Sequence, residues 1–361
     1  MNNQNALLQM LDLLTAPAFC VKDGTVIKCN PAARTLMFEN GMQISSLLET
    51  GVQEYAQFQA GCLYLTVKAA GHSWGASVTP VGSCRVFLLE SEEGQAELKS
   101  LALAAQSLRS PLSGIMTVTD HLLSAGKVSE SPETAGEISR LNQELYKMLR
   151  TVSNMSDAAR FAGNRKPAME NHNLTGLFGE ILEQAETLAE NAGIQLTFEN
   201  LGQPVFSAAN SEMLERAVYN ILSNALKFTP KGGTVRASLR KSGNLLAFTV
   251  RNTGEAVPEE MRGELFARYL RHPGVEDGRY GIGLGTVLIR SAAAAHGGTV
   301  LLEYPEDGGM NVTMTVRLSA AKPGKLSTPV LRVDYAGERS HSLIELSEVL
   351  PPKLYEKDKI N

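Results

Sequence analysis

The sequence predicts a multidomain α+β protein. Short runs near the start alternate apolar and polar residues, as strands do, whereas the middle of the chain repeats apolar residues three and four apart, as paired helices do. Helical and strand patterns then alternate toward the end. A chain of 361 residues is long enough for two or three domains with separate cores. We therefore expect domains at residues 1–93, 94–162 and 168–320, followed by a tail at 321–361.

The overall charge excludes one class of partner. The 34 basic and 38 acidic side chains give a net charge of -4, so no positive excess is left to neutralise a phosphate backbone, and a nucleic-acid partner is not expected. No apolar run approaches the roughly 18 residues that span a bilayer, and the first residues lack a signal-peptide pattern. We expect no membrane span and a cytoplasmic location.

The four cysteines all lie in the first quarter of the chain. They form no CxxC pair and have no histidine at ligand spacing. We therefore expect buried free thiols, rather than a metal or redox site, at Cys20, Cys29, Cys62 and Cys84.

Residues 1–93 contain the short alternating runs. Asp23-Gly24 is expected to form a hairpin turn between two strands, and the second strand ends in Asn-Pro-Ala-Ala at residues 30–33. Helical residues and three further strand-like runs follow, and the whole segment resembles a PAS sensor domain. The resemblance implies an α/β fold that in many relatives holds a small-molecule ligand in an apolar pocket. A packed core without a ligand fits the sequence equally well.

Residues 94–162 contain two heptad repeats. The first comprises Leu98, Leu101, Ala105, Leu108, Leu112, Ile115, Thr119 and Leu122, and the second Ile138, Leu141, Leu145, Met148, Val152 and Met155. Gly, Ser and Pro between them end one helix and start the next. The two helices should form an antiparallel hairpin, which has too little core unless a second copy completes a four-helix bundle. We therefore expect a homodimer.

Three motifs between residues 168 and 320 indicate a nucleotide site. In the first, Asn220, Asn224 and Lys227 are four and three residues apart and share one face of a predicted helix. Amide oxygens coordinate Mg²⁺, and a lysine meets phosphate oxygens. A solvated helix face carries the same residue types, so this motif indicates a nucleotide site only together with the other two motifs.

The second and third motifs follow in order along the chain. The second is the end of a strand running into a turn, and it contains Asn252 and Gly254. The third places Gly281, Gly283 and Gly285 ahead of a helical run, where closely spaced glycines let backbone N–H groups approach phosphates.

Together these motifs resemble the N, G1 and G2 boxes of the ATPase superfamily that includes histidine kinases, Hsp90, gyrase and MutL, and residues 264–269 resemble its F box. The resemblance implies an α/β sandwich that binds ATP and Mg²⁺. It also implies that Asn220 helps to hold Mg²⁺, that Asn224 and Lys227 contact the phosphates, that position 252 binds the adenine amino group, and that the segment from Gly281 to Gly285 belongs to a mobile lid.

Two positions depart from the family pattern. Relatives carry aspartate where this chain has Asn252, and Ala256 replaces the second glycine of the G1 box. A hydrogen bond to a neutral acceptor is worth about 1 kcal/mol less than one to a charged acceptor, which weakens binding roughly five- to tenfold. We expect ATP to bind more loosely than in relatives.

Residues 106–112, Gln-Ser-Leu-Arg-Ser-Pro-Leu, resemble the H box of dimerising histidine kinases, usually His-Glu-Leu-Arg-Thr-Pro-Leu. Gln106 follows the seam residue Ala105, so its side chain should face outward, and Pro111 should kink the helix. An amide is not nucleophilic, and Ser107 replaces the acid that serves as general base in the family. We expect no phosphate transfer to position 106.

Three functions remain open. The first is a histidine-kinase-like two-component signalling protein that binds ATP without autophosphorylation. The second is a phosphatase in which Gln106 and Ser110 orient water toward the aspartyl phosphate of a response-regulator receiver domain. The third is an active kinase that phosphorylates the histidine of a partner kinase in trans. In relatives the receiver domain docks on the first heptad helix, so it is the expected partner.

The tail at residues 321–361 contains one strand-like run, VLRVDY, and one helical run, SLIELSEVL. Both runs are short, so the tail either docks on the preceding domain or remains a partly disordered interaction segment.

Overall fold

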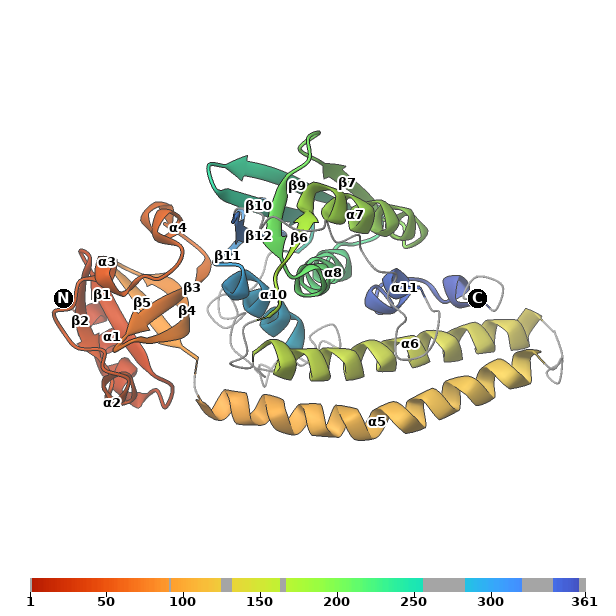
Figure 1. Cartoon of the computed structure of the whole chain (residues 1–361), viewed down its shortest axis with the longest axis horizontal. Coiled ribbons are helices and arrows are strands. Elements are labelled where there is room, and N and C mark those ends of the chain that lie inside the picture. The colour runs from red at the N-terminus through yellow and green to blue at the C-terminus, as the bar shows by residue number, and fades with distance from the viewer. Residues whose placement is uncertain are drawn as a thin grey trace.

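The computed structural model describes residues 2–90, 92–124, 132–162, 167–255, 283–319 and 340–356. Figure 1 shows an N-terminal region (residues 2–90) beside an α/β region (167–319), with a helical hairpin (92–162) along one side of the α/β region. A C-terminal segment (340–356) lies between the hairpin and the helices of the α/β region.

The N-terminal region folds around an antiparallel sheet. Its elements are α1 (Asn2–Leu13), β1 (Ala18–Lys22), β2 (Thr25–Cys29), α2 (Pro31–Thr35), α3 (Ile44–Leu47), α4 (Val52–Gln57), β3 (Cys62–Ala69), β4 (His72–Val81) and β5 (Cys84–Leu89). The strands pair in the order β2-β1-β5-β4-β3. The predicted β1–β2 hairpin is confirmed: Asp23 and Gly24 have φ of 48° and 78°, as a two-residue hairpin turn requires.

Stacked aromatic rings fill the core of the N-terminal region. The ring centroid of Phe19 lies 5.0 Å from that of Phe38 and 4.6 Å from that of Phe87, and all three side chains are fully buried. The four cysteines are buried free thiols, which confirms the prediction. Burial raises the pKa of the Cys62 thiol to about 11, so it stays protonated and unreactive near neutral pH.

The hairpin consists of α5 (Glu92–Ser124) and α6 (Pro132–Phe161). α5 continues through Pro111, and Figure 1 shows a gentle bend along its length rather than a break. Among the described helices, none is apolar enough over a sufficient length to cross a membrane.

The heptad seam is only half covered within one chain. Leu112 on α5 and Leu145 on α6 are buried, whereas the intervening positions Leu108 and Ile115 on α5, and Leu141 on α6, are 45%, 49% and 47% exposed. One half of each seam packs between the two helices, and the other half remains at the surface.

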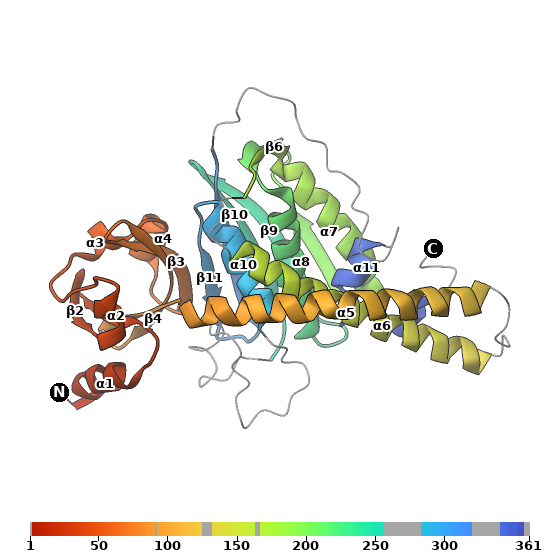
Figure 2. The ribbon, with the colours of Figure 1, turned by 60° about the horizontal axis from the view of Figure 1, so that its bottom comes forward.

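The α/β region contains strands and helices in alternation. Its elements are β6 (Glu170–Asn173), α7 (Leu174–Asn191), β7 (Gln195–Glu199), β8 (Phe206–Ala209), α8 (Ser211–Lys227), β9 (Thr234–Ser242), β10 (Leu245–Asn252), α10 (Leu284–Ala295), β11 (Val300–Glu303) and β12 (Met310–Arg317). The main sheet runs β11-β12-β10-β9-β7, with β7 and β9 parallel. β6 and β8 form a separate small sheet that the sequence did not indicate. Helices α7, α8 and α10 pack on the main sheet (Figure 2).

The hairpin does not have a core of its own. α6 packs against α10 and the C-terminal segment. Tyr146 and Leu149 of α6 therefore belong to the same buried cluster as Leu222 of α8 and Leu288 of α10. The hairpin, the α/β region and the C-terminal segment share one apolar core.

The two sheets are also joined. β3 of the N-terminal region pairs antiparallel with β11 of the α/β region, with Leu63 opposite Leu301 and Tyr64 opposite Val300. In the described residues the result is a single ten-stranded sheet. The sequence predicts strands in both regions but not that they pair with each other.

The C-terminal segment contains α11 (His341–Glu345) and a 3-10 helix, η1 (Pro352–Tyr355). Both pack on α6, and α11 also contacts α7 and α8. Of the two alternatives for the tail, docking therefore holds for residues 340–356. The run VLRVDY lies outside the described residues.

Candidate functional site

The first motif lies on the last two turns of α8. The Asn210 side chain caps this helix by accepting the Met213 N–H at 2.9 Å, and its apolar residues turn into the core. Asn220 is 2% exposed, whereas Asn224 is half-buried and Lys227 retains 16% of its side-chain surface. The motif therefore runs from a buried amide to a partly exposed ammonium group.

Asn220 is held on both sides. Its Nδ2 donates to the Arg216 carbonyl at 2.8 Å, and its Oδ1 accepts a hydrogen bond from Arg150 Nη2 of α6 at 3.4 Å. A Cβ atom at Gly285 would lie 2.7 Å from the same Oδ1. Only glycine lets the backbone of α10 approach Asn220 so closely, and the first and third motifs therefore meet here.

The third motif opens α10. Gly283 is the N-cap residue, with φ of 78°, and as a glycine it has no side chain with which to cap the helix. Backbone N–H groups at such an N-terminus favour an anionic ligand. Gly281, Ala256 and the F-box-like residues 264–269 lie outside the described residues.

The second motif lies beside the end of α8. Asn252 ends β10 and is 3% exposed. Its Oδ1 accepts the Met310 N–H at 3.0 Å, and its Nδ2 faces the Phe228 carbonyl at 3.5 Å. A Cβ atom at Gly254 would lie 2.2 Å from that carbonyl oxygen. The described parts of all three motifs therefore converge on the second half of α8 and the residues that follow it.

An acidic residue of the C-terminal segment, Glu348, reaches the polar face of α8. Glu348 Oε2 lies 2.6 Å from Lys227 Nζ, and Glu348 Oε1 lies 2.9 Å from Arg150 Nη1. Burial alone would raise the pKa of Glu348, but the Arg150 and Lys227 cations hold it below its usual range. The side chain is therefore a carboxylate at neutral pH.

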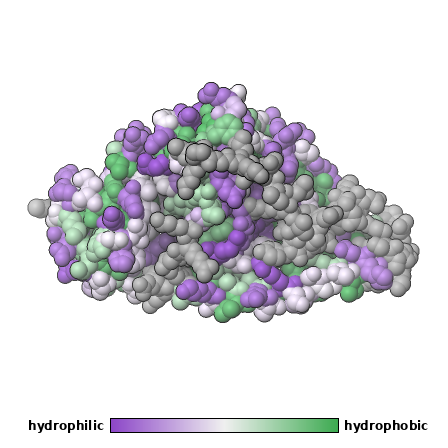
Figure 3. Space-filling model, in the orientation of Figure 1, coloured by the Kyte–Doolittle hydropathy of each residue, from purple (hydrophilic) through white to green (hydrophobic). Residues whose placement is uncertain are grey.

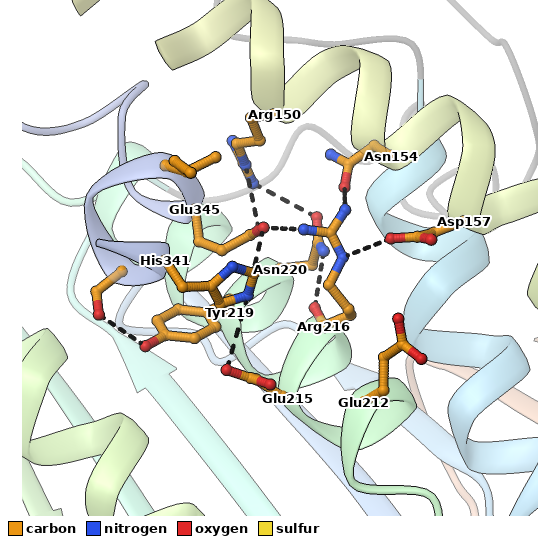
Figure 4. Close-up of polar contacts among 12 residues, drawn as sticks. Arg150, Asn154, Asp157, Glu212, Glu215, Arg216, Tyr219, Asn220, His341 and Glu345 are labelled. Atoms are coloured by element: carbon orange, nitrogen blue, oxygen red, sulfur yellow. Dashed lines mark hydrogen bonds and ion pairs between the residues drawn. The ribbon is translucent and has the colours of Figure 1, made fainter. Parts of the chain in front are cut away.

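Behind Glu348 lies a buried charge cluster, shown in Figure 4. Arg216 of α8 donates to the fully buried Glu345 carboxylate and, at 2.8 Å, to Asn154 Oδ1. Its Nε lies 3.0 Å from Asp157 of α6. The sequence does not reveal this cluster, because a single arginine on a helix carries no information about which carboxylates will surround it.

The H-box-like residues lie elsewhere. Gln106, Ser107 and Ser110 are exposed on α5, and Ser107 Oγ donates to the Ala104 carbonyl at 2.8 Å. Figure 1 shows α6 between α5 and the α/β region. The structure therefore confirms that Gln106 faces outward, but it does not bring Gln106 next to the three motifs.

The converged motifs have the donor set that a nucleotide requires. The start of α10, where the N-cap residue is a glycine, supplies backbone N–H groups for phosphate oxygens, and the amide oxygens of Asn220 and Asn224 suit Mg²⁺. Gly285 leaves room for a close backbone approach. The residues present therefore fit an ATP–Mg²⁺ group.

Comparisons with known proteins point the same way. Residues 209–320 match the family described as histidine kinase-, DNA gyrase B- and HSP90-like ATPase. The sensor histidine kinase CusS of Escherichia coli O6:H1 is 33% identical over 54% of this chain and 40% of its own length. Hybrid signal transduction histidine kinase D of Dictyostelium discoideum is 30% identical over 62% of this chain and 15% of its own length. The chain therefore spans less than half the length of these two relatives.

The solved structures agree at the level of the fold. The structure of full-length ShkA in complex with AMPPNP has a TM-score of 0.50 and 22% identity, and the match covers 62% of this chain and 47% of ShkA. The order of the motifs and their convergence around α8 agree with these comparisons. Residues 209–320 match this ATPase family, and about half of the chain is similar to sensor histidine kinases.

Proposed function

We propose that this protein is a two-component signalling protein that binds Mg²⁺-ATP between α8 and α10 and does not autophosphorylate at position 106. The observation that carries the proposal is the meeting of Asn220 with Gly285 in a chain whose H-box position is an exposed glutamine. Nucleotide then acts as a conformational ligand rather than as a phosphate donor.

Two findings support nucleotide binding. The residues around α8 fit the phosphates and the metal, as described above, and the fold is shared with ShkA, which is in complex with AMPPNP. Asn252 Oδ1 already accepts one backbone N–H. A carbonyl oxygen has two lone pairs, so it retains capacity for the adenine amino group. The site is expected to bind ATP more loosely than sites with aspartate.

The surface of the hairpin supports a homodimer. Leu108, Ile115, Leu141 and Met148 leave 45–49% of their surface exposed, and Val118 leaves 59%. Figure 3 shows apolar patches along the lower edge of the molecule, where α5 runs. The hairpin of a second chain would cover these exposed side chains in a four-helix bundle.

The N-terminal region supports a PAS-like sensor. The β1–β2 hairpin leads into α2, α3 and α4, and the strands β3 to β5 return beside β1, as the resemblance implies. Phe19, Phe38 and Phe87 are stacked at its centre. A small-molecule ligand would have to part these rings to enter.

Isothermal titration with Mg²⁺-ATP tests the nucleotide site. We expect binding in the range of cellular ATP concentrations. Asn224→Ala should weaken it about fivefold, because one hydrogen bond of about 1 kcal/mol is lost. Asn244→Ala, in the exposed turn between β9 and β10, is the matched control and should have no effect. A dissociation constant far above the cellular ATP concentration would refute the proposal.

Incubation with γ-labelled ATP tests the missing transfer. We expect no label on the purified protein, because Gln106 lacks a nucleophile and Ser107 lacks a basic side chain. Stable label on the chain would show an active kinase. Label on a co-purified partner kinase would instead favour phosphorylation in trans.

A phosphatase is the second candidate, and one observation favours it. Gln106 and Ser110 are four residues apart on α5, so they share one helix face, and both are exposed. An amide and a hydroxyl placed in this way could orient water toward a receiver-domain aspartyl phosphate. Gln106→Ala should then slow the dephosphorylation of a pre-labelled response regulator, while Thr117→Ala, also exposed on α5, should not. Equal rates would rule out this role.

A further inference from the structure

The C-terminal segment makes specific contacts with α6. Asn142 Nδ2 donates to the Tyr355 carbonyl at 3.0 Å. Gln143 Nε2 donates to the carbonyls of Ser347, at 3.1 Å, and Leu350, at 2.6 Å. These two amides of α6 satisfy three backbone carbonyls of the segment, between Ser347 and Tyr355. The segment is therefore bound in one register rather than lying loosely on the surface.

Apolar packing reinforces these hydrogen bonds. The segment buries Leu343, Ile344, Leu346, Leu350 and Tyr355 in the core shared by the hairpin and the α/β region. The ring of Tyr355 packs edge-on against Tyr146 of α6, with centroids 5.1 Å apart. Figure 1 places the segment between α6 and the helices of the α/β region.

Glu345 locks the segment to both neighbouring helices. Its buried carboxylate accepts from Arg216 of α8 and lies 3.7 Å from Arg150 Nε of α6. Figure 4 shows the arginines approaching it from the two helices. A buried carboxylate between two guanidinium groups is stable only while the segment stays in place, so docking of the segment also holds α6 against α8.

Glu348 then reaches the nucleotide motif itself. Its carboxylate lies 2.6 Å from Lys227 Nζ, the group expected to contact ATP phosphates, and 2.9 Å from Arg150 Nη1. Arg150 in turn donates to Asn220 Oδ1, the oxygen expected to coordinate Mg²⁺. A carboxylate at this distance occupies one of the three N–H donors of Lys227 and repels a phosphate group, so the two ligands compete for Lys227.

We propose that residues 340–356 act as an internal competitor of the nucleotide, with the Glu348 carboxylate in the place of a phosphate group. This inference rests on the proposed function, because it takes Asn220 and Lys227 to be the nucleotide-binding residues. The segment and the nucleotide exclude each other, so nucleotide binding releases the segment from α6 and α8. A signal that loosens the segment thereby raises the affinity for ATP.

The competition changes the apparent dissociation constant of the nucleotide by a measurable factor. When only a fraction of the molecules is competent to bind, the apparent dissociation constant rises by the reciprocal of that fraction. A docked state favoured about ten to one therefore weakens nucleotide binding about tenfold. The coupling is reciprocal, so saturating nucleotide displaces the segment by the same factor.

Titration of the full chain with Mg²⁺ and AMPPNP tests the competition. Glu348→Gln keeps the shape of the side chain and removes its charge, and it should lower the dissociation constant about threefold or more. Glu49→Gln, at an exposed position of the N-terminal region, makes the same change of charge far from Lys227 in sequence and fold, and it should leave the affinity unchanged.

Hydrogen exchange on the wild-type chain provides a second readout that needs no variant. Saturating Mg²⁺-AMPPNP should speed exchange in residues 341–355. Equal affinities of wild type and Glu348→Gln, or unchanged exchange in a nucleotide-bound chain, would overturn the competition and leave the nucleotide site standing. If wild type, Glu348→Gln and Glu49→Gln all fail to bind AMPPNP, the proposed nucleotide site itself is wrong.

Discussion

Arg290 Nη2 of α10 lies 3.7 Å from the Glu90 carboxylate, which directly follows β5. The same guanidinium lies over the ring of Tyr64 on β3, 5.2 Å from its centroid. Glu54 of α4 accepts hydrogen bonds from the hydroxyl groups of Thr299 and Thr315 at 3.3 and 3.2 Å. The N-terminal region therefore contacts α10, the helix that begins at the glycine motif. These contacts connect the N-terminal region directly to the proposed nucleotide site.

The β3–β11 junction depends on Gly61. This residue has φ of 92°, and a Cβ atom there would lie 2.0 Å from the Leu302 carbonyl oxygen. Gly61→Ala should lower the free energy of unfolding by about 1–2 kcal/mol for the left-handed backbone and by about 1–3 kcal/mol more for the clash. Gly71→Ala is the control, because Gly71 has φ of 84° and no neighbour within 4 Å. Urea unfolding measures both, and equal losses would mean that the close approach is unimportant.

Gly285 should be required for nucleotide binding. A Cβ atom there would push on Asn220 Oδ1, 2.7 Å away, and Asn220 cannot yield without losing its hydrogen bond to the Arg216 carbonyl. Gly285→Ala should weaken Mg²⁺-AMPPNP binding about tenfold, for a cost of about 1.4 kcal/mol. Gly114→Ala lies in α5 with open space around it and should instead stabilise the chain by about 0.5–1 kcal/mol. Unchanged nucleotide affinity in Gly285→Ala would show that the close approach of Gly285 to Asn220 is not needed for binding.

Glu345 should be the most sensitive charged residue of the C-terminal segment. It is fully buried between Arg216 and Arg150, and removal of one partner of a buried pair costs about 3–5 kcal/mol. Glu345→Gln should therefore shift the urea midpoint strongly downward. Glu199→Gln breaks an ion pair with Arg240 whose side chains are 69% and 66% exposed, and it should cost about 0–1 kcal/mol. A small shift in Glu345→Gln would show that the cluster does not stabilise the docked state.

His296 should make stability depend on acid pH. Its Nε2 accepts the Asn210 N–H at 3.0 Å, so Nδ1 carries the proton and donates to the Ala292 carbonyl at 2.7 Å. Burial lowers the pKa of His296 from its usual value of 6.5. Above that value the ring is neutral in both states. Below it the unfolded chain takes up a proton that the folded chain does not, so the free energy of unfolding falls as pH falls.

Urea titrations at pH 7.5 and 5.5 measure this effect. His296→Gln should lose stability at pH 7.5 and should show a smaller further loss at pH 5.5 than wild type. His121→Gln removes an exposed histidine from α5 and should follow the wild-type pH dependence. If His296→Gln keeps that dependence unchanged, another group is responsible for it.

The sequence predicted what depends on local spacing. The face that carries Asn220 and Lys227 follows from helical periodicity, and the β1–β2 hairpin follows from the backbone preferences of Asp23-Gly24. The strand from Glu170 to Asn173 is not evident from the sequence, because its side chains show no alternation of apolar and polar types. Local patterns therefore determined most of the elements and the residue types of the site.

The arrangement of those elements in space was not predictable in the same way. Alternation in β3 shows that it is a strand but not that Leu63 will face Leu301 of another region. The heptads identified Leu108 and Leu112 as seam residues, but only the fold shows that Leu112 is covered within the chain and Leu108 is not. The sequence indicates only that Glu345 and Glu348 belong to a helical run, since nothing in their spacing reveals arginines more than a hundred residues earlier in the chain.

The shared sheet also constrains the order of synthesis. Leu63 emerges from the ribosome more than 200 residues before its partner Leu301, which at about 5–20 residues per second is a delay on the order of ten seconds or more. During that time β3 is an unpaired sheet edge with exposed backbone hydrogen-bonding groups, which favours association with other nascent chains. The nascent N-terminal region should therefore need a chaperone, or a slow rate of expression, until β11 arrives to cover it.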